Sequence, residues 1–237
     1  MKKFIIMFSG NIGSGKTYSA NYLYNKFPND SIILSFATPI KNLFSSVFIN
    51  KDGILEKNYA EKPILELYKL YYFFKEKINE NFFEYEKYIK NSLEKNLINH
   101  FMYYFLEKDQ ERRKQLARRL FQMFGTDIVR NKVDKNFFVK EMIKKIETSD
   151  KNIFLIDDLR FENEALLIKK YFENKNYSVK IICINCNEDN RNLKEISSHE
   201  SEKQIKKIRK IADYNFENNK TNLYEINLNQ IENFLLS

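Results

Sequence analysis

A glycine-rich motif near the start of the chain has residue types that bind phosphate groups. The segment from Gly10 to Thr17 reads Gly-Asn-Ile-Gly-Ser-Gly-Lys-Thr and satisfies the pattern G-x-x-x-x-G-K-[ST] in full. Its glycines allow backbone N–H groups to turn inward, and a helix start adds a positive dipole end, so the motif predicts an anion cradle. We expect Lys16 to reach the β and γ phosphates of ATP and the Thr17 hydroxyl to bind Mg²⁺. The predicted nucleotide-binding residues are Gly10, Asn11, Gly13, Ser14, Gly15, Lys16 and Thr17.

A second chemical feature lies where an apolar run ends in two acidic residues. Asp157 and Asp158 follow Ile156 directly, and Arg160 comes two positions later. An acid at a strand end beside a phosphate loop holds Mg²⁺ through water, and we assign that role to Asp158, acting with Thr17. Arg160 is expected to hold the phosphate of an acceptor or to neutralise charge during transfer. A strand-end salt bridge is the alternative interpretation of this arginine.

The glycine motif is flanked by segments that predict a strand and a helix. Lys2 to Phe8 is a continuous apolar run, as in a parallel strand buried on both faces, and Ser14 to Phe27 has helical spacing. Further strands are expected at 31–36, 152–156, 178–184 and 223–226, and helices at 40–48, 135–147, 162–172, 202–212 and 229–235. This alternation predicts an α/β fold: a P-loop NTPase core with a five-stranded parallel sheet flanked by helices. Ligands should lie at the carboxyl ends of its strands.

The segment from Pro63 to Phe124 interrupts the alternation. It contains neither Gly nor Pro between Ile64 and Phe124, and it is rich in Tyr, Phe, Lys and Glu, which favours a helical insertion. Its aromatic residues could stack on nucleic-acid bases, but aromatic residues at helical spacing more often form a core. We adopt the core interpretation.

Composition bounds the remaining possibilities. The 237 residues are 43% hydrophobic and 30% charged, with a mean hydropathy of -0.56, which is typical of a globular protein with a polar surface. No run approaches the roughly 18–20 apolar residues of a membrane span, and no targeting segment is recognised. The net charge of +8 favours anionic partners, although Lys is abundant throughout. Cys183 and Cys186 form a single C-x-x-C pair, which favours two reduced cytosolic thiols over a zinc site.

Four separated motifs in addition to the glycine motif resemble those of the deoxynucleoside monophosphate kinases of large tailed phages, a branch of the P-loop nucleoside monophosphate kinases. Besides the glycine motif, the segment from Phe36 to Lys41 resembles that family's "small residue, x, Pro, Ile/Leu, Lys" segment. The segment from Arg118 to Asp127 resembles its R-x-L-x-Q-x-x-G-T-[DE] segment, which is the more distinctive of the two. Asp158-Leu159-Arg160 matches its D-x-R, and the segment from His199 to Glu202 matches its H-x-[ST]-E in a lid-like region.

The resemblance implies a kinase that uses ATP and Mg²⁺ to convert a deoxynucleoside monophosphate to the diphosphate. It implies one domain over residues 1–237, with a core at about 1–38, 151–184 and 203–237, an acceptor-binding insertion at about 39–150 and a lid at about 185–202. The expected acceptor contacts are Lys41, Arg118, Arg119, Gln122, Thr126, Asp127, Arg130 and Arg160. The expected lid residues are Arg191, Lys194, His199 and Glu202, of which Arg191 and Lys194 would close onto the transferring phosphoryl group. Lys16, Asp158, Arg160 and Arg191 are the predicted catalytic residues.

The spacing of the acceptor motif is compatible with binding. Arg118, Gln122 and Gly125 fall at i, i+4 and i+7, on one face of a predicted helix, while the opposite side is apolar. A solvated basic helix face is the alternative for the arginines, and a mobile charged loop is the alternative for the lid residues.

Two other functions remain open at this level. A P-loop kinase of another small phosphorylated metabolite would share the ATP site, and a nucleic-acid-binding NTPase would use the basic charge for a strand. The kinase interpretation implies small nucleotide substrates, no membrane, no stable nucleic-acid binding and a cytoplasmic location, in the host if a phage encodes the chain. A homodimer and the preferred base are left open.

Overall fold

A five-stranded parallel sheet is the central element of the computed structural model, which describes residues 2–41, 112, 122–186, 200–218 and 222–236. The strand order is β2-β3-β1-β4-β5, and every neighbouring pair is parallel. The strands are β1 (Lys3–Gly10), β2 (Ser31–Leu34), β3 (Ile153–Leu159), β4 (Tyr177–Asn185) and β5 (Tyr214–Glu217). The predicted α/β core with a five-stranded parallel sheet is therefore confirmed.

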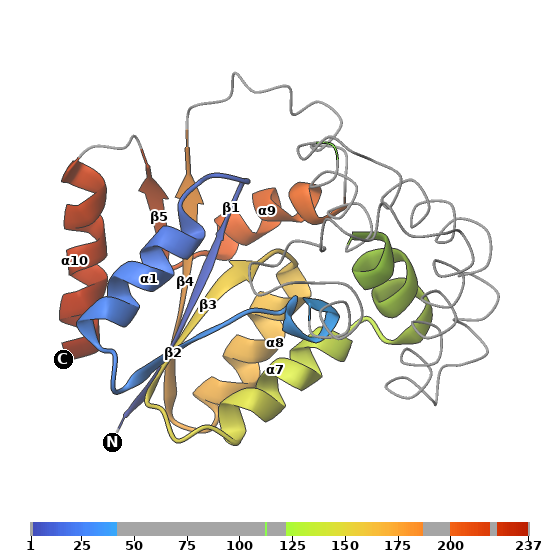
Figure 1. Cartoon of the computed structure of the whole chain (residues 1–237), viewed down its shortest axis with the longest axis horizontal. Helices are drawn as coiled ribbons and strands as arrows, with labels where there is room; N and C mark the ends of the chain where they lie inside the picture. The colour runs from blue at the N-terminus through green and yellow to red at the C-terminus, as the bar shows by residue number, and fades with distance from the viewer. Residues whose placement is uncertain (1, 42–111, 113–121, 187–199, 219–221, 237) are drawn as a thin grey trace, which may run out of the picture. The chain divides into compact units, whose positions relative to one another are not determined.

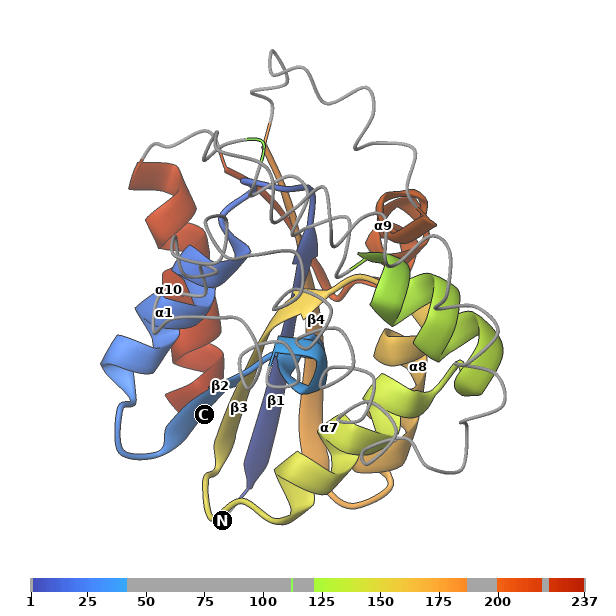
Figure 2. The same ribbon diagram turned by 45° about the vertical axis from the view of Figure 1, so that its right-hand side comes forward.

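Helices cover both faces of this sheet (Figures 1 and 2). On one face lie α1 (Lys16–Lys26) and α10 (Asn222–Leu236), and on the other lie α7 (Phe137–Glu147), α8 (Glu162–Glu173) and α9 (Glu200–Ile211). A parallel sheet needs such double cover because its strands are apolar on both sides. The central strand shows this directly, since the side chains from Phe4 to Phe8 are at most 7% exposed.

The side chains of each central strand alternate between the two helical layers. Phe4, Ile6 and Phe8 of β1 belong to a buried cluster that also contains Ala20 and Leu23 of α1. Ile153 and Leu155 of β3, together with Leu228 and Ile231 of α10, join the same cluster. Odd-numbered residues of β3 therefore face α1 and α10, and even-numbered residues face the other layer.

The fifth strand is not where the sequence suggested. Residues 223–226 lie in α10, whose buried residues Tyr224, Leu228, Ile231 and Leu235 recur at helical spacing, so the predicted strand there is wrong. The strand is instead Tyr214–Glu217, in which Phe216 is the buried residue. A short polar edge strand of this kind carries little hydrophobic signal.

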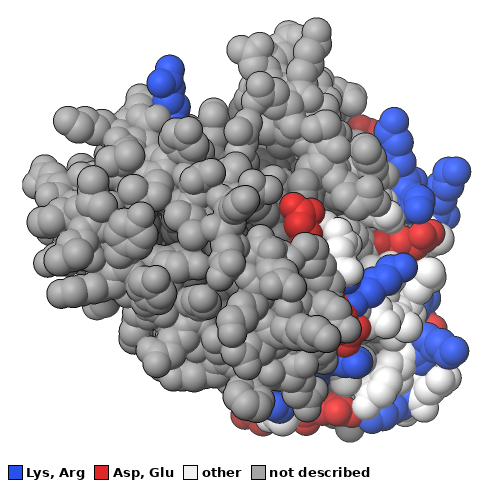
Figure 3. Space-filling view, turned by 90° about the vertical axis from the view of Figure 1, so that its right-hand side faces the viewer, with Lys and Arg blue, Asp and Glu red and all other residues white. Residues whose placement is uncertain are grey.

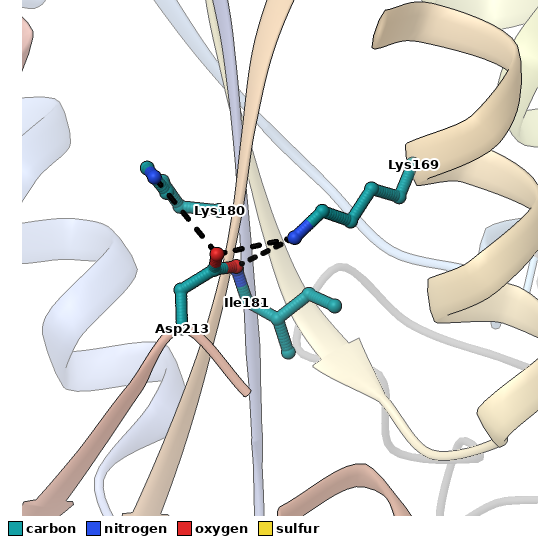
Figure 4. Close-up of polar contacts among 4 residues, drawn as sticks. All are labelled: Lys169, Lys180, Ile181 and Asp213. Atoms are coloured by element: carbon teal, nitrogen blue, oxygen red, sulfur yellow. Dashed lines mark hydrogen bonds and ion pairs between the residues drawn. The ribbon is translucent and has the colours of Figure 1, made fainter. Parts of the chain in front are cut away.

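Asp213 fastens this edge strand to its neighbours (Figure 4). Its backbone N–H donates to the Ile181 carbonyl at 2.8 Å, and its carboxylate accepts the Ile181 N–H at 2.8 Å. The Lys169 ammonium of α8 lies 3.1 Å from the same carboxylate, and the Lys180 ammonium lies 3.8 Å away. One side chain thus joins β5, β4 and α8.

The chain divides into two compact units, residues 1–36 with 138–237, and residues 37–137. The sheet belongs to the first unit, as does almost all of α7, which the sequence assigned to the insertion. In the second unit the described residues form a helical turn at 38–41 and the π-helix η3 (Met123–Val133). Most of the predicted insertion, at 42–111 and 113–121, and most of the predicted lid, at 187–199, lie outside the described residues.

Candidate functional site

The glycine motif forms the connection between β1 and α1, at the carboxyl end of the central strand. Gly10 and Gly15 have positive φ angles of 142° and 103°. A Cβ atom on Gly10 would lie 2.1 Å from the Ile184 carbonyl oxygen, and one on Gly15 would lie 2.6 Å from the Asn218 amide nitrogen. At Gly10 both the backbone angle and the space require glycine, and at Gly15 the positive φ favours it.

Lys16 folds its side chain back over the loop. Its ammonium donates hydrogen bonds to the backbone carbonyls of Gly10, at 2.8 Å, and Asn11, at 2.7 Å. The positive charge therefore lies beside the first residues of the loop, while the loop's last residues begin α1. A positive side chain, a helix start and a glycine turn at one place are the parts of an anion site.

Thr17 of α1 meets the acidic end of β3. Its hydroxyl donates a hydrogen bond of 3.0 Å to Asp157, which lies on the same side of β3 as Ile153 and Leu155. Asp158 points to the other side, where its carboxylate accepts the Ser35 hydroxyl at 2.6 Å and the Phe36 N–H at 2.7 Å. Of these two acids it is therefore Asp157 that contacts Thr17, because strand alternation places it on that side of β3.

Arg160 follows on the turn between β3 and α8. The carboxylate of Glu164, a residue only 1% exposed, accepts the backbone N–H groups of Arg160, at 3.0 Å, and Phe161, at 2.9 Å. A buried carboxylate at a helix start satisfies N–H groups that the helix leaves without intrahelical partners, and it suits the helix dipole. Glu164 thus fixes the backbone from which the half-buried Arg160 side chain departs.

The C-terminal part of the chain contacts the end of the glycine loop. Asn218, which directly follows β5, donates from its side-chain amide to the Ser14 carbonyl at 2.9 Å. The Tyr224 hydroxyl of α10 is hydrogen-bonded to the hydroxyl of Ser19, which also donates to the Gly15 carbonyl at 2.9 Å. Burial raises the pKa of Tyr224 to about 12, so this phenol stays neutral well above physiological pH.

Cys183 and Cys186 lie at the end of β4 and just beyond it, and both are free thiols. Cys183 is buried, and burial raises the pKa of its thiol. Raising that pKa lowers the thiolate fraction, so this cysteine is less reactive than an exposed one.

Apart from Arg160, the predicted acceptor residues that can be described belong to the second unit. Lys41 is exposed at the end of the helical turn, Thr126 is buried, Asp127 is exposed, and Gln122 and Arg130 are half-buried on or next to η3. Arg130 donates to the Lys135 carbonyl at 3.5 Å. The N–H of Asp134 bonds to the Val129 carbonyl, an i to i+5 bond, so Gly125 lies in a π-helix where an α-helix was expected.

The other predicted residues lie beyond what the structure describes. Arg118 and Arg119 belong to 113–121, and Arg191, Lys194 and His199 to 187–199, whereas Glu202 is in α9. Sequence reasoning missed Asn218, Glu164, Ser35 and Tyr224. The alternation along β3 could have favoured Asp157 over Asp158, but only once the face of β3 that α1 covers was known.

One comparison with known proteins identifies a family that covers most of the chain. A family model described as deoxynucleotide monophosphate kinase matches residues 3–221, which include the glycine loop, Asp157 and Asn218. A search of curated proteins found no match. None of the helices that the structure describes is long and apolar enough to span a membrane.

Proposed function

The chain belongs to the deoxynucleotide monophosphate kinase family, and on that premise we propose that it transfers the γ-phosphoryl group of ATP to a deoxynucleoside monophosphate. The products are the deoxynucleoside diphosphate and ADP. The observation that carries the proposal is the arrangement of Lys16 and Thr17 on the glycine loop, with the Asp157 carboxylate 3.0 Å from the Thr17 hydroxyl. An ammonium group, a hydroxyl and a carboxylate are the groups that bind the terminal phosphates of a nucleotide and their Mg²⁺.

The proposed reaction is an in-line displacement. A phosphate oxygen of the acceptor attacks the γ-phosphorus as the bond from that phosphorus to the β–γ bridging oxygen breaks, and ADP leaves with the electron pair. The attacking oxygen is already negatively charged near neutral pH, so no general base is needed. The loop's N–H groups and the Lys16 ammonium stabilise charge on the phosphates, and the rest of the task is alignment.

The residues beside the loop fit a magnesium ion. A threonine hydroxyl and a carboxylate are hard oxygen donors, which Mg²⁺ prefers, and Thr17 and Asp157 bring them within 3.0 Å of each other. Thr17 would hold the ion directly and Asp157 through water. When bound, Mg²⁺ neutralises charge on the β and γ phosphates.

The acceptor is proposed to be held by the basic and polar side chains that the sequence motifs single out. Lys41, Arg118, Arg119, Arg130 and Arg160 would surround its phosphate, and Gln122, Thr126 and Asp127 would contact its sugar or base. Lys194 and Arg191 of the lid would then close over the transferring group, with His199 and Glu202 tying the closed lid. Closure would keep water from hydrolysing ATP.

The described part of one face carries charges of both signs. On the face of the described surface in Figure 3, Lys and Arg side chains are interspersed with Asp and Glu. A surface that binds a nucleic-acid strand concentrates positive charge along the path of the nucleic-acid backbone.

We place the reaction in the cytoplasm, where nucleotide substrates are found.

A substrate panel tests the proposal. Purified protein is incubated with MgATP and each of the four deoxynucleoside monophosphates, the ribonucleoside monophosphates or single-stranded DNA, and the diphosphate product and ADP are quantified. We expect turnover with at least one deoxynucleoside monophosphate and loss of most of it in Lys16→Ala. ADP formation that depends on DNA and not on any monophosphate would reject the proposal. An absence of turnover on the whole panel would also reject it.

A further inference from the structure

Asn218 is attached to both the sheet and the glycine loop. Its backbone N–H donates to the Asn185 carbonyl at the end of β4, at 2.7 Å, which continues the ladder between β4 and β5. Its side-chain amide donates to the Ser14 carbonyl at 2.9 Å. Asn218 therefore holds the last part of the loop at a fixed distance from the edge of the sheet.

This contact sets the direction of a loop N–H group. The peptide unit is planar and trans, so the carbonyl of Ser14 and the N–H of Gly15 point in opposite directions. Holding the Ser14 carbonyl toward Asn218 therefore directs the Gly15 N–H away from Asn218. Ser19 does the same for the next peptide unit, because its hydroxyl and its N–H both bond to the Gly15 carbonyl at 2.9 Å. That carbonyl shares a peptide unit with the N–H of Lys16.

The packing around Gly15 is fitted to this arrangement. A Cβ atom there would lie 2.6 Å from the Asn218 amide nitrogen and 3.5 Å from the Tyr224 hydroxyl. Tyr224 is 3% exposed, and its hydroxyl contacts Ser19, so the support of the second peptide unit also comes from the C-terminal part of the chain. The first of two consecutive peptide units of the loop is thus oriented by Asn218, and the second by Ser19, whose hydroxyl is in turn bonded to Tyr224.

We propose that Asn218 is a positioning residue for the phosphates of the bound nucleotide: it orients the Ser14–Gly15 peptide unit so that the loop presents its N–H groups to the anion. The inference rests on the proposed nucleotide site at this loop. It does not depend on which acceptor is phosphorylated. Phosphate binding by backbone N–H groups is sensitive to their orientation, because a hydrogen bond weakens steeply when it is misaligned.

Equilibrium binding of MgATP, measured by calorimetry without any acceptor, tests this role in the full chain. Asn218→Ala removes the amide donor, and we expect the Kd for MgATP to rise about three- to tenfold, the usual effect of one lost hydrogen bond. Asn218→Asp keeps the size but replaces the donor by a negative charge, so its Kd should rise further. The matched control is Asn229→Ala. This variant loses the hydrogen bond of 2.6 Å that Asn229 of α10 accepts from Tyr22 of α1, and this bond does not involve the loop. Its Kd should equal that of the wild type.

The melting temperature of each variant separates positioning from stability. A residue that only stabilised the fold would lower the melting temperature and leave the Kd of the folded protein unchanged, and that result would overturn the inference. If Asn218→Ala does not fold, the isosteric Asn218→Asp decides, and a Kd within twofold of the wild type rejects the role. Steady-state kinetics add a second readout, since the KM for ATP should rise while the KM for the acceptor stays constant. A wild-type protein that binds MgATP but phosphorylates no monophosphate would refute the proposed function and leave the binding test of Asn218 intact.

Discussion

The Thr17 hydroxyl and the Asp157 carboxylate are joined by a hydrogen bond of 3.0 Å across a sequence separation of 140 residues. Thr17 is the last residue of the glycine motif, and Asp157 is near the end of the strand that neighbours β1. The next residue, Asp158, has its carboxylate engaged by Ser35 and Phe36 on the opposite side of β3. The carboxylates of these two adjacent acids therefore contact different parts of the protein.

Replacing Asp157 should impair the metal-dependent reaction selectively. In Asp157→Asn the carboxylate charge beside Thr17 is lost, and we expect activity or Mg²⁺ affinity to fall about 10- to 100-fold, as for other outer-shell partners of a metal site. The measurement is the Mg²⁺ concentration that gives half-maximal turnover. Asp158→Asn is the matched control and should leave this concentration unchanged. An equal shift in the two variants would contradict the separate roles.

The strands could be predicted from the sequence where they are buried, because a buried strand consists of a continuous run of apolar residues. β1, β3 and β4 are apolar on both faces, so their runs were recognised within a few residues. The edge strand β5 was missed because only Phe216 of its four residues is buried, and much of its attachment comes from polar contacts of Asp213. The pattern from Tyr224 to Leu235 was read as a strand and a short helix, although its buried residues keep one helical period throughout.

The site was predictable where chemistry is local. The glycine loop is a contiguous motif, so Lys16 and Thr17 could be assigned from sequence alone. Asn218 could not, because it meets Ser14 across 204 positions and follows a strand that the sequence did not reveal. The choice between Asp157 and Asp158 required knowing which face of β3 is covered by α1, which is a property of the assembled sheet.

Alanine should be tolerated very differently at two glycines of the loop. A Cβ on Gly10 would collide with the Ile184 carbonyl at 2.1 Å, whereas one on Gly13 would have no atom within 4 Å. Gly13→Ala should then cost only the strain of its φ of 76°, about 1–2 kcal/mol. Gly10→Ala should lose more stability and most MgATP binding, because β4 must move. Thermal unfolding and calorimetry on both variants check this, and equal losses would argue against a tight approach at Gly10.

Removing the Asp213 side chain should destabilise the sheet edge. Asp213→Ala loses the bond to the Ile181 N–H and the ion pair with Lys169, and we expect about 1–3 kcal/mol less unfolding free energy. Asp213→Asn retains an oxygen acceptor for Ile181 and should lose less. Urea denaturation gives both values. A loss in Asp213→Asn as large as in Asp213→Ala would assign the effect to the ion pair instead of the backbone contact.

Tyr224 should make the fold sensitive to alkaline pH. Burial raises the pKa of this phenol to about 12 from an unfolded value near 10, so the unfolded chain loses the proton first as pH rises. The stabilisation is fully present below pH 10 and is lost as pH rises toward 12, by at most about 1.4 kcal/mol per pH unit.

Tyr224→Phe has no phenol proton at this position. The difference in unfolding free energy between wild type and Tyr224→Phe, measured by urea denaturation from pH 8 to 11.5, should therefore be constant up to about pH 10 and then shift in favour of the variant. The tyrosines distant from Tyr224 titrate in both proteins and cancel in this difference. A difference that stayed constant over the whole range would show that the pKa of Tyr224 is the same in the folded and the unfolded chain. The hydrogen bond between Tyr224 and Ser19 would then not require a neutral phenol.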